Sequence, residues 1–295
     1  MLTALIELSG SAVLGIAPYM HSVEEALALP TTVKLGAVLP KARPPVLSFG
    51  AFVDVSKLVL PDKVDYFTKA ATSTNRMYVN DRLGCCVISS SYHRIGVWTA
   101  NDTPATVVAT DQEVVAMYNR LKAGPGDSGC VISDVLDYVV AKGLPCSGIL
   151  HRSGGYVACD WRRPDLVKAA IYLFGAGPIG FALPQAWTQS AVWDTTNSQT
   201  IGGHDVAVVG YDTRGVQVSS WGRIYTMTWA AFTSTRWVME FYPVLSPDWY
   251  NDDRLAPNGI DVAALQVALA RLGQGTLPDP EPPTPPDPPP PTPGA

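Results

Sequence analysis

The spacing of apolar residues differs between the two halves of this chain. Between residues 86 and 174, apolar side chains recur every three or four positions, which is the period of a helix with one buried face. The first such segment begins near Cys86, directly after the turn residue Gly84, and includes Ile95 and Trp98. The pattern predicts a buried helix that starts at Cys86.

Three further helices are predicted in the same half. Thr110 and Glu113 have the spacing of a capping box, so a helix begins there and ends before 124–125, Gly-Pro. The other two are expected at about 133–143, ending at Gly143, and at 164–174, followed by Gly175.

Beyond residue 176 the pattern changes to short segments rich in β-branched and aromatic residues. Examples are GPIGFAL (177–183), HDVAVVGY (204–211) and VQVSSW (216–221), which are separated by turns such as 212–215. Helices followed by strands predict an α+β fold in which the two groups form separate layers or lobes, a helical N-terminal half and an antiparallel β-rich C-terminal half. A ligand is expected in the cleft between the lobes.

The two ends of the chain differ from this central part, which we place at residues 61–250. Prolines interrupt residues 1–60, which we expect to form an arm across the body. Its apolar start has no Lys or Arg before Lys34 and contains Glu7, so we expect no signal peptide.

The C-terminal end combines an amphipathic segment with a proline-rich one. Within 251–275, Asp261 precedes apolar residues at helical spacing, namely Val262, Leu265, Leu269 and Leu272. Residues 276–295 contain eleven of the 26 prolines, which favours a disordered polyproline II spacer over a ligand for an aromatic groove. The predicted helix is a candidate to dock on the body or on a partner protein.

The composition excludes several classes of function. The net charge of -5, without a cluster of Lys or Arg, argues against nucleic acid as a partner. No apolar run is long enough to cross a membrane, so we expect a soluble protein. Five irregularly spaced cysteines without a CxxC pair predict a reducing compartment, no metal and no cofactor.

Cys86 is the first candidate for chemistry. A cysteine in the first turn of a helix gains thiolate character from the positive end of the helix dipole and from any nearby imidazolium. Taken alone, such a cysteine is more often inert packing. A reactive role therefore depends on what the rest of the chain supplies.

The order of motifs supplies that context. A Gly-x-Cys turn (84–86) opens a helix, and it is followed by GGH (202–204) at the start of a strand, by GYD (210–212) and by SSWG (219–222). In this order the chain resembles the papain-like cysteine peptidases, over roughly residues 75–245. The resemblance implies a two-lobed fold, Cys86 as nucleophile and His204 as base, with peptides or proteins as substrates.

The same resemblance assigns three further positions, two of them with a changed residue. Asn80, six residues before Cys86, stands where the family has the glutamine that donates to the oxyanion. Ser219 stands where the family has the asparagine that orients the histidine, and Trp221 is expected to shield that hydrogen bond. For Trp221 the alternative is ordinary core packing.

The stretch from Lys34 to about residue 247 also resembles papain-like proteins of actinobacterial phages. In those relatives the turn reads Leu-Gly-Asp-Cys, so Cys85 fills the variable position and Cys86 that of the nucleophile. This resemblance implies a protein of the host cytoplasm or of the virion. The disulfide that secreted relatives make at the position of Cys130 needs a cysteine where this chain has Leu83, so that bridge is not expected.

The remaining candidates favour structural roles. The GDSG at 126–129 is also found in trypsin-like serine peptidases, but the flanking pattern is helical and His93 lies only 35 residues before Ser128, so Asp127 and Ser128 are expected in a turn and a helix cap. His93 is two helical turns from Cys86, about 10 Å, too far to be its base. Surface or capping roles are expected for His21 and His151, and Cys146 and Cys159 are expected to be reduced.

Three functions remain open at this point. The first is a hydrolase that cleaves peptide or isopeptide bonds through Cys86 and His204. The second is a degenerate papain-like protein with a structural or binding role, for which Ser219 and Asn80 are the arguments. The third is an amidase or transferase that uses the same pair on a non-protein amide.

Overall fold

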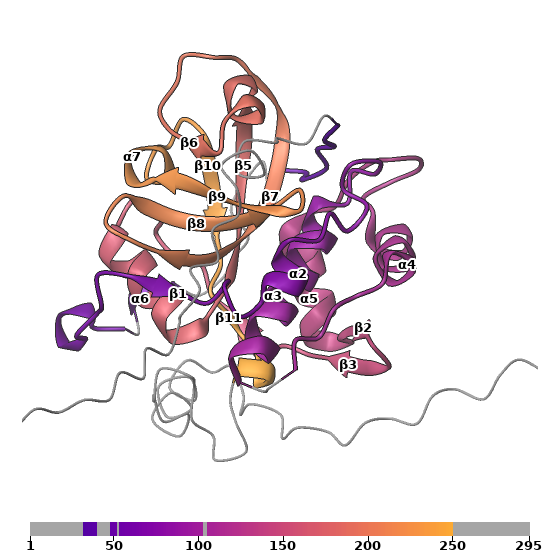
Figure 1. The fold of residues 1–295 in the computed structure, drawn as a ribbon, viewed down its shortest axis with the longest axis horizontal. Helices are drawn as coiled ribbons and strands as arrows, with labels where there is room; N and C mark the ends of the chain where they lie inside the picture. The colour runs from indigo at the N-terminus through magenta and orange to yellow at the C-terminus, as the bar shows by residue number, and fades with distance from the viewer. Residues whose placement is uncertain (1–31, 40–47, 52, 103–104, 250–295) are drawn as a thin grey trace, which may run out of the picture.

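The computed structural model describes residues 32–39, 48–51, 53–102 and 105–249, and they form an α+β fold built around one long strand (Figure 1). The predictions for His21, for 251–275 and 276–295, and for most of 1–60 lie outside these residues.

The central element is a seven-stranded sheet. Six strands follow one another in the order β10 (Val238–Phe241), β5 (Gly177–Pro184), β7 (Thr200–Tyr211), β8 (Gly215–Ser220), β9 (Arg223–Thr228) and β6 (Val192–Trp193). The seventh, β1 (Val64–Asp65), pairs with the end of β7. All pairs are antiparallel except β6 with β9, which are parallel.

The predicted helices form where the sequence signals stand. They are α3 (Cys86–Asp102), α4 (Asp111–Leu121), α5 (Ile132–Ala141) and α6 (Pro164–Phe174). The capping box of α4 is present, because Thr110 accepts from the Glu113 amide and the Glu113 carboxylate accepts from the Thr110 amide. Gly175, with φ of 76°, ends α6. Two short helices, α2 (Ala71–Thr74) and α7 (Trp229–Phe232), complete the set within the described residues.

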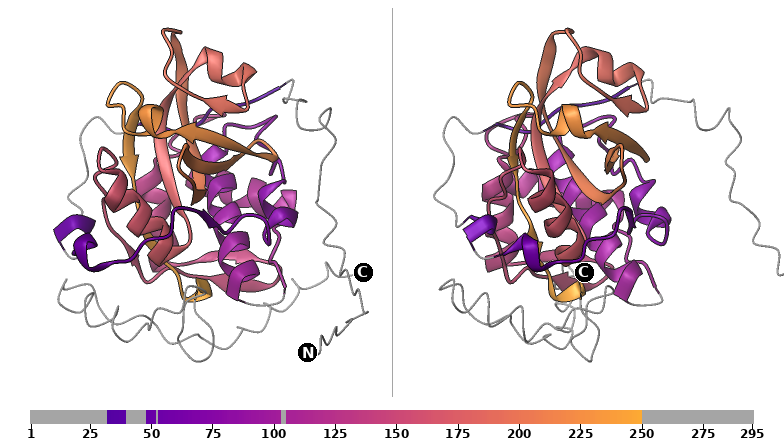
Figure 2. Two further views of the ribbon diagram at one scale, coloured as in Figure 1. Left: turned by 60° about the vertical axis from the view of Figure 1, so that its left-hand side comes forward. Right: turned by 90° about the vertical axis from the view of Figure 1, so that its left-hand side faces the viewer.

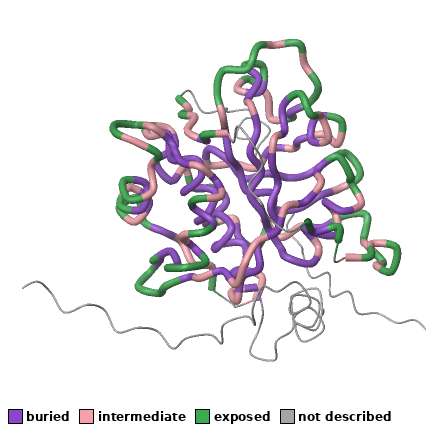
Figure 3. The backbone as a smooth tube through the Cα atoms, turned by 180° about the vertical axis from the view of Figure 1, so that it is seen from behind, coloured by how far each residue is buried: buried purple, intermediate pink, exposed green. Residues whose placement is uncertain are grey.

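Strand β7 separates two hydrophobic cores. Val206 and Val208 point into one core, together with α6, whereas Ala207 and Val209 point into the other, together with α3, α4 and α5. Figure 2 shows these helices on opposite sides of the sheet, and Figure 3 shows the continuous buried backbone between them. Alternation along one strand therefore decides which core each side chain of β7 enters.

The order of elements along the chain does not sort them cleanly into two lobes. Helix α6 lies in the helical half of the sequence but packs on the sheet, in the core with Val206 and Val208. Short strands lie between α5 and α6: β2 (Leu144–Cys146) pairs with β3 (Ile149–His151), and β4 (Gly155–Tyr156) pairs with β11 (Val244–Leu245). Helix α6 is therefore the cover of the sheet on the side away from α3.

In the part of the chain that the structure describes, no helix combines the length and the apolar character needed to cross a bilayer. Within the same residues, no group of three histidine, cysteine or acidic side chains is arranged to hold a metal ion.

Candidate active site

Cys86 is the first residue of α3 and lies where that helix meets β7. The turn before it is fixed by Asp127, whose Oδ1 accepts from the Gly84 amide at 2.8 Å and from the Tyr118 hydroxyl at 2.5 Å. The Cys86 side chain is 1% exposed, and burial, reinforced by the nearby negative charge of Asp205, raises the pKa of its thiol well above the usual value. The backbone amides of Asp205 and Gly36 act in the opposite direction. Cys86 therefore faces β7 and the N-terminal segment.

The neighbouring Cys85 points elsewhere. Its Sγ lies 3.4 Å from the Tyr78 carbonyl oxygen and from the Ser89 hydroxyl, inside the helical core. Burial raises the pKa of Cys85 to about 11. Of the two cysteines, the geometry favours Cys86 as the one that faces the other half of the molecule.

His204 lies on β7, with its imidazole in the core on the sheet side. Nε2 is 2.8 Å from the Ser220 hydroxyl, and the ring stacks on Trp221 at 4.3 Å between centroids and 15° between planes. Phe181, the cross-strand partner of His204, meets the ring edge-on. Burial in these apolar surroundings lowers the pKa of His204 to about 3.

The structure does not join Cys86 and His204 by a hydrogen bond. His204 Nδ1 is buried and has no hydrogen-bond partner, and Cys86 packs in the helical core, whereas the aromatic residues around His204 belong to the core on the sheet side. In this conformation the thiol and the imidazole are both neutral at neutral pH. Nδ1 is the nitrogen that remains available to accept a proton.

The hydroxyl beside His204 belongs to Ser220 and not to Ser219, where the sequence placed it. Ser219 pairs with Ala207 and faces the helical side, where its hydroxyl donates to the Thr74 carbonyl at 2.8 Å. Ser220 lies on the opposite face of β8, which is the face that His204 shares. The spacing from Trp221 in the family motif assigned the orienting role to Ser219, one residue before the serine that contacts His204.

Asn80 also has partners other than the expected one. Its Nδ2 lies 3.2 Å from the Lys34 carbonyl oxygen and 3.0 Å from the Leu83 carbonyl oxygen, so both amide hydrogens are directed at backbone carbonyls. In this conformation Asn80 holds the N-terminal segment and does not point to an open oxyanion position.

That segment, residues 32–39, runs between the turn before α3 and the start of β7, and we call this passage the seam. Its backbone is held by Lys34 N to Asn80 O (2.9 Å), Cys130 N to Gly36 O (2.8 Å), Ala37 N to Gly203 O (3.1 Å) and Val38 N to Cys130 O (2.9 Å). Ala37 and Cys130 pair as a parallel bridge. In Figure 1 the indigo segment lies beside β7. Residues 34–38 therefore cover the approach to Cys86.

Comparison with solved structures identifies the fold. Xylellain, a cysteine protease from Xylella fastidiosa, matches with a TM-score of 0.56 and 18% identity over 74% of this chain and 99% of its own. Procathepsin L2 from Tenebrio molitor matches with a TM-score of 0.56 and 14% identity over 72% of this chain and 78% of its own. Procathepsin B S9 from Trypanosoma congolense gives 0.55 and 13%, over 72% and 86%.

The fold is papain-like. At this level of identity the similarity establishes the fold alone. No protein-family model matches the sequence, and the search for similar curated proteins found no match.

One feature of this papain-like structure was not predicted: a buried charged cluster between α3 and β7. Arg94 donates to the Ser90 and Ser91 hydroxyls at 2.9 Å, and its Nε has no hydrogen-bond partner. Asp205 faces it from β7 with both carboxylate oxygens buried and unpartnered. Burial raises the pKa of Asp205 well above its usual value, although the Arg94 charge opposes the shift.

Glu240 on β10 adds a second carboxyl to this cluster. Burial raises its pKa to about 7, partly offset by the 2.8 Å hydrogen bond from the Tyr242 hydroxyl. Glu240 lies close enough to Asp205 for its charge to raise the pKa of Asp205 further. The sequence signal was the Asp directly after His204, which alternation places on the opposite face of β7.

The other histidines of this part of the chain have structural roles. His151 was expected at the surface or in a cap, and that was wrong: it is buried, and its Nδ1 lies 2.9 Å from Asp248 Oδ2. His93 Nε2 lies 3.0 Å from the Arg76 carbonyl oxygen, and burial lowers its pKa to about 4. All five cysteines are free, including Cys130, Cys146 and Cys159.

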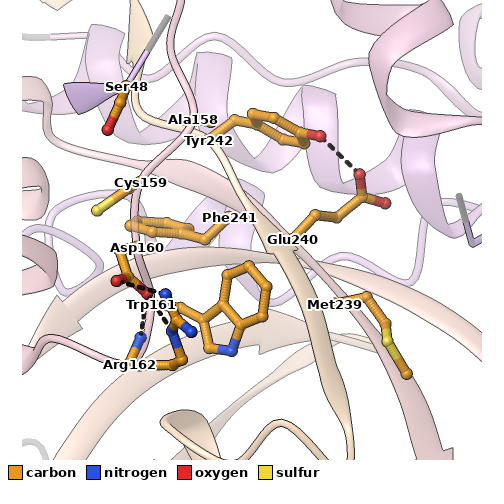
Figure 4. Close-up of a pocket in the computed structure, with 10 residues that line it drawn as sticks. All are labelled: Ser48, Ala158, Cys159, Asp160, Trp161, Arg162, Met239, Glu240, Phe241 and Tyr242. Carbon is orange, nitrogen blue, oxygen red and sulfur yellow. Dashed lines mark hydrogen bonds and ion pairs between the residues drawn. The ribbon is translucent and has the colours of Figure 1, made fainter. Parts of the chain in front are cut away.

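The structure also contains a cavity away from Cys86, with a volume of about 290 Å³ (Figure 4). It is lined by residues 158–162, by 239–242 and by Ser48. The dashed lines in Figure 4 join Tyr242 to Glu240 and Asp160 to Arg162. None of the candidate catalytic residues lines it, so it is separate from the site described above.

Proposed function

We propose that this chain is a cysteine peptidase-like hydrolase of peptide or isopeptide bonds, held here in a latent conformation. Cys86 is the nucleophile and His204 is the base and acid. The observation that carries the proposal is the placement of Cys86 at the N-terminus of a buried helix, against the strand that carries His204, with a peptide segment in the seam between them. Two of the structures with a similar fold are named as procathepsins, which fits a latent form.

The reaction requires residues 34–38 to leave the seam. Water then reaches Cys86 and His204, and the desolvation that keeps both neutral is relieved. His204 Nδ1 accepts the thiol proton, while Ser220 holds Nε2 and Trp221 holds the ring. The thiolate attacks the carbonyl carbon, His204 returns the proton to the leaving amine, and the C–N bond breaks to leave a thioester on Cys86. A water molecule that gives a proton to His204 then attacks the thioester, releases the acid, and the proton returns to Cys86.

The oxyanion is stabilised at the N-terminus of α3. The Cys86 amide has no partner within the helix, because the first amides of a helix have none. When Lys34 departs, one hydrogen of the Asn80 amide is released and becomes available as a second donor. Loss of one such donor typically costs about 10²- to 10³-fold in rate.

The test is the pH dependence of iodoacetamide labelling at Cys86, followed by mass spectrometry. We expect slow labelling of the wild-type chain below pH 8, and fast labelling at pH 5–6 in a Gly36→Ala variant, in which the segment is displaced. Adding His204→Ala to that variant removes the labelling at low pH. Gly124→Ala is the matched control, since a Cβ there meets only Ser128 at 3.8 Å.

Equal and slow labelling of Gly36→Ala with and without His204 contradicts the enzyme. A second function then applies: a papain-like structural or binding protein, which the phage resemblance would place in a phage particle. The observations in its favour are the absence of a hydrogen bond at His204 Nδ1 and the binding of Ser219 to Thr74.

A further inference from the structure

The walls of the seam over Cys86 are bare backbone. A Cβ on Gly36 would overlap the Gly84 carbonyl group and would lie 2.6 Å from Gly84 Cα. Gly84 belongs to the turn that Asp127 fixes directly before α3, so this wall cannot retreat by moving a side chain. A peptide on this path therefore has room for no side chain at the position of Gly36.

The opposite walls are equally close. A Cβ on Gly129 would overlap the Gly36 carbonyl oxygen, and one on Gly203 would overlap the Ala37 carbonyl oxygen. The bound segment is held on both sides by backbone hydrogen bonds, which any sequence except proline can form. Selection among peptides must therefore come from steric fit at individual positions.

The residues on either side of Gly36 also pack into the protein. Leu35 packs against the sheet-side core, and Ala37 is 8% exposed within the helical core. Lys34 and Val38 are exposed and contribute little to the fit. The seam therefore accommodates leucine at position 35, glycine at position 36 and alanine at position 37.

We propose that the seam over Cys86 is a peptide-binding channel selective for glycine at the residue that crosses Gly84, with a leucine-sized residue before it and a small residue after it. Residues 32–39 are its occupant within the chain, and substrate peptides of this pattern compete for it. The substrate part of this inference rests on the proposed function, whereas the binding part does not.

The experiment uses the full-length Gly36→Ala variant and two fluorescein-labelled peptides. One has the sequence of residues 32–39, and the other is the same peptide with Gly36→Ala. Fluorescence anisotropy measures binding without any contribution from the chemistry of Cys86. We expect the glycine peptide to bind at least tenfold more tightly than the alanine peptide, and to bind the Gly124→Ala control weakly because its channel is filled.

A second readout is the protection of Cys86 from iodoacetamide. The glycine peptide is expected to slow labelling of the Gly36→Ala variant about tenfold, and the alanine peptide is expected to leave it unchanged. Binding by the glycine peptide together with slow labelling at every pH contradicts the enzyme but supports the channel. Equal binding of both peptides, or binding of neither, overturns the channel whatever the labelling shows.

Lys34→Pro provides a second way to displace the segment if Gly36→Ala does not fold. It removes the amide that donates to the Asn80 carbonyl, along with an exposed side chain, and leaves the glycines at 84, 129 and 203 in place. The same tenfold preference is expected in this variant.

Discussion

The two faces of β7 surround adjacent residues with opposite chemistry. His204 enters a face of aromatic rings, with Trp221 and Phe181 against it and one hydroxyl, that of Ser220. Asp205 enters a face with a buried guanidinium, that of Arg94. The first face lowers the pKa of His204. The second face carries the Asp205 carboxylate, whose negative charge opposes thiolate formation at Cys86.

In the latent state proposed above, electrostatics would add to the steric cover of Cys86. On the aromatic face no charge compensates an imidazolium, and on the polar face Asp205 disfavours a thiolate. Formation of the proposed ion pair thus has to overcome the burial of the imidazole and the charge of Asp205 near the thiol. The following predictions test the two faces in order of expected effect.

The largest effect is expected from Arg94→Met. This change leaves the buried Asp205 without its cation, and breaking a buried ionic group in this way typically costs about 3–5 kcal/mol of unfolding free energy. Urea denaturation measures the loss. Arg82→Met, at an exposed ion pair, is the control and is expected to cost less than about 1 kcal/mol. Similar losses in the two variants would mean that the buried cluster does not contribute.

The next largest effect is expected on the pH dependence of stability, through the protonation of His204. Its pKa is about 3 in the folded chain against an ordinary value of 6.5, so the unfolded chain binds the proton first as the pH falls. The stability that this provides is complete above pH 6.5 and is lost as the pH falls towards 3, by about 3 kcal/mol at pH 4.

In His204→Phe this part of the acid sensitivity is expected to disappear, while the part due to His93 remains. Urea denaturation at pH 7, 5 and 4 compares the variant with the wild type. Parallel losses of stability in both proteins would contradict the buried, neutral imidazole.

A smaller effect is expected from Asp205→Asn. Removal of the carboxylate charge lowers the pKa of Cys86, so labelling at pH 8 is expected to be several-fold faster, measured in the Gly36→Ala background. Glu240→Gln removes the other carboxyl of the cluster and is the control. If it accelerates labelling as much as Asp205→Asn, the proximity of Asp205 to Cys86 is not the cause.

The smallest effects separate the two serines. Ser219→Ala and Ser220→Ala each remove one buried hydrogen bond, worth about 1 kcal/mol of stability. In the Gly36→Ala background, only Ser220→Ala is expected also to slow labelling of Cys86 at pH 6, by about fivefold, since it frees the imidazole that Ser220 orients. A slowing in Ser219→Ala instead would return the orienting role to Ser219.

Local signals in the sequence predicted the helices well. Thr110 and Glu113 begin α4, and Gly175 ends α6, because capping depends on residues within one turn. The pairing of strands was less predictable. Register decides that Ser219 faces α2 and Ser220 faces His204, and register depends on the whole sheet.

Two features of the structure, one at the site and one away from it, could not be predicted from the sequence. The path of residues 32–39 depends on glycines at 84, 129 and 203, which come together only in the folded chain. The burial of His151 against Asp248 depends on a contact between residues 97 positions apart. Neither has a local pattern that would indicate it.

The tethering of residues 32–39 sets the terms of competition for the channel. Phe49, just downstream, is anchored to Ala158 by a 2.7 Å hydrogen bond, so the segment remains close to its binding site even when it is released. A ligand on such a short tether behaves as if present at about millimolar concentration. Dilution therefore does not open the channel, and a free peptide at micromolar concentration reaches Cys86 only after the segment is cut or changed.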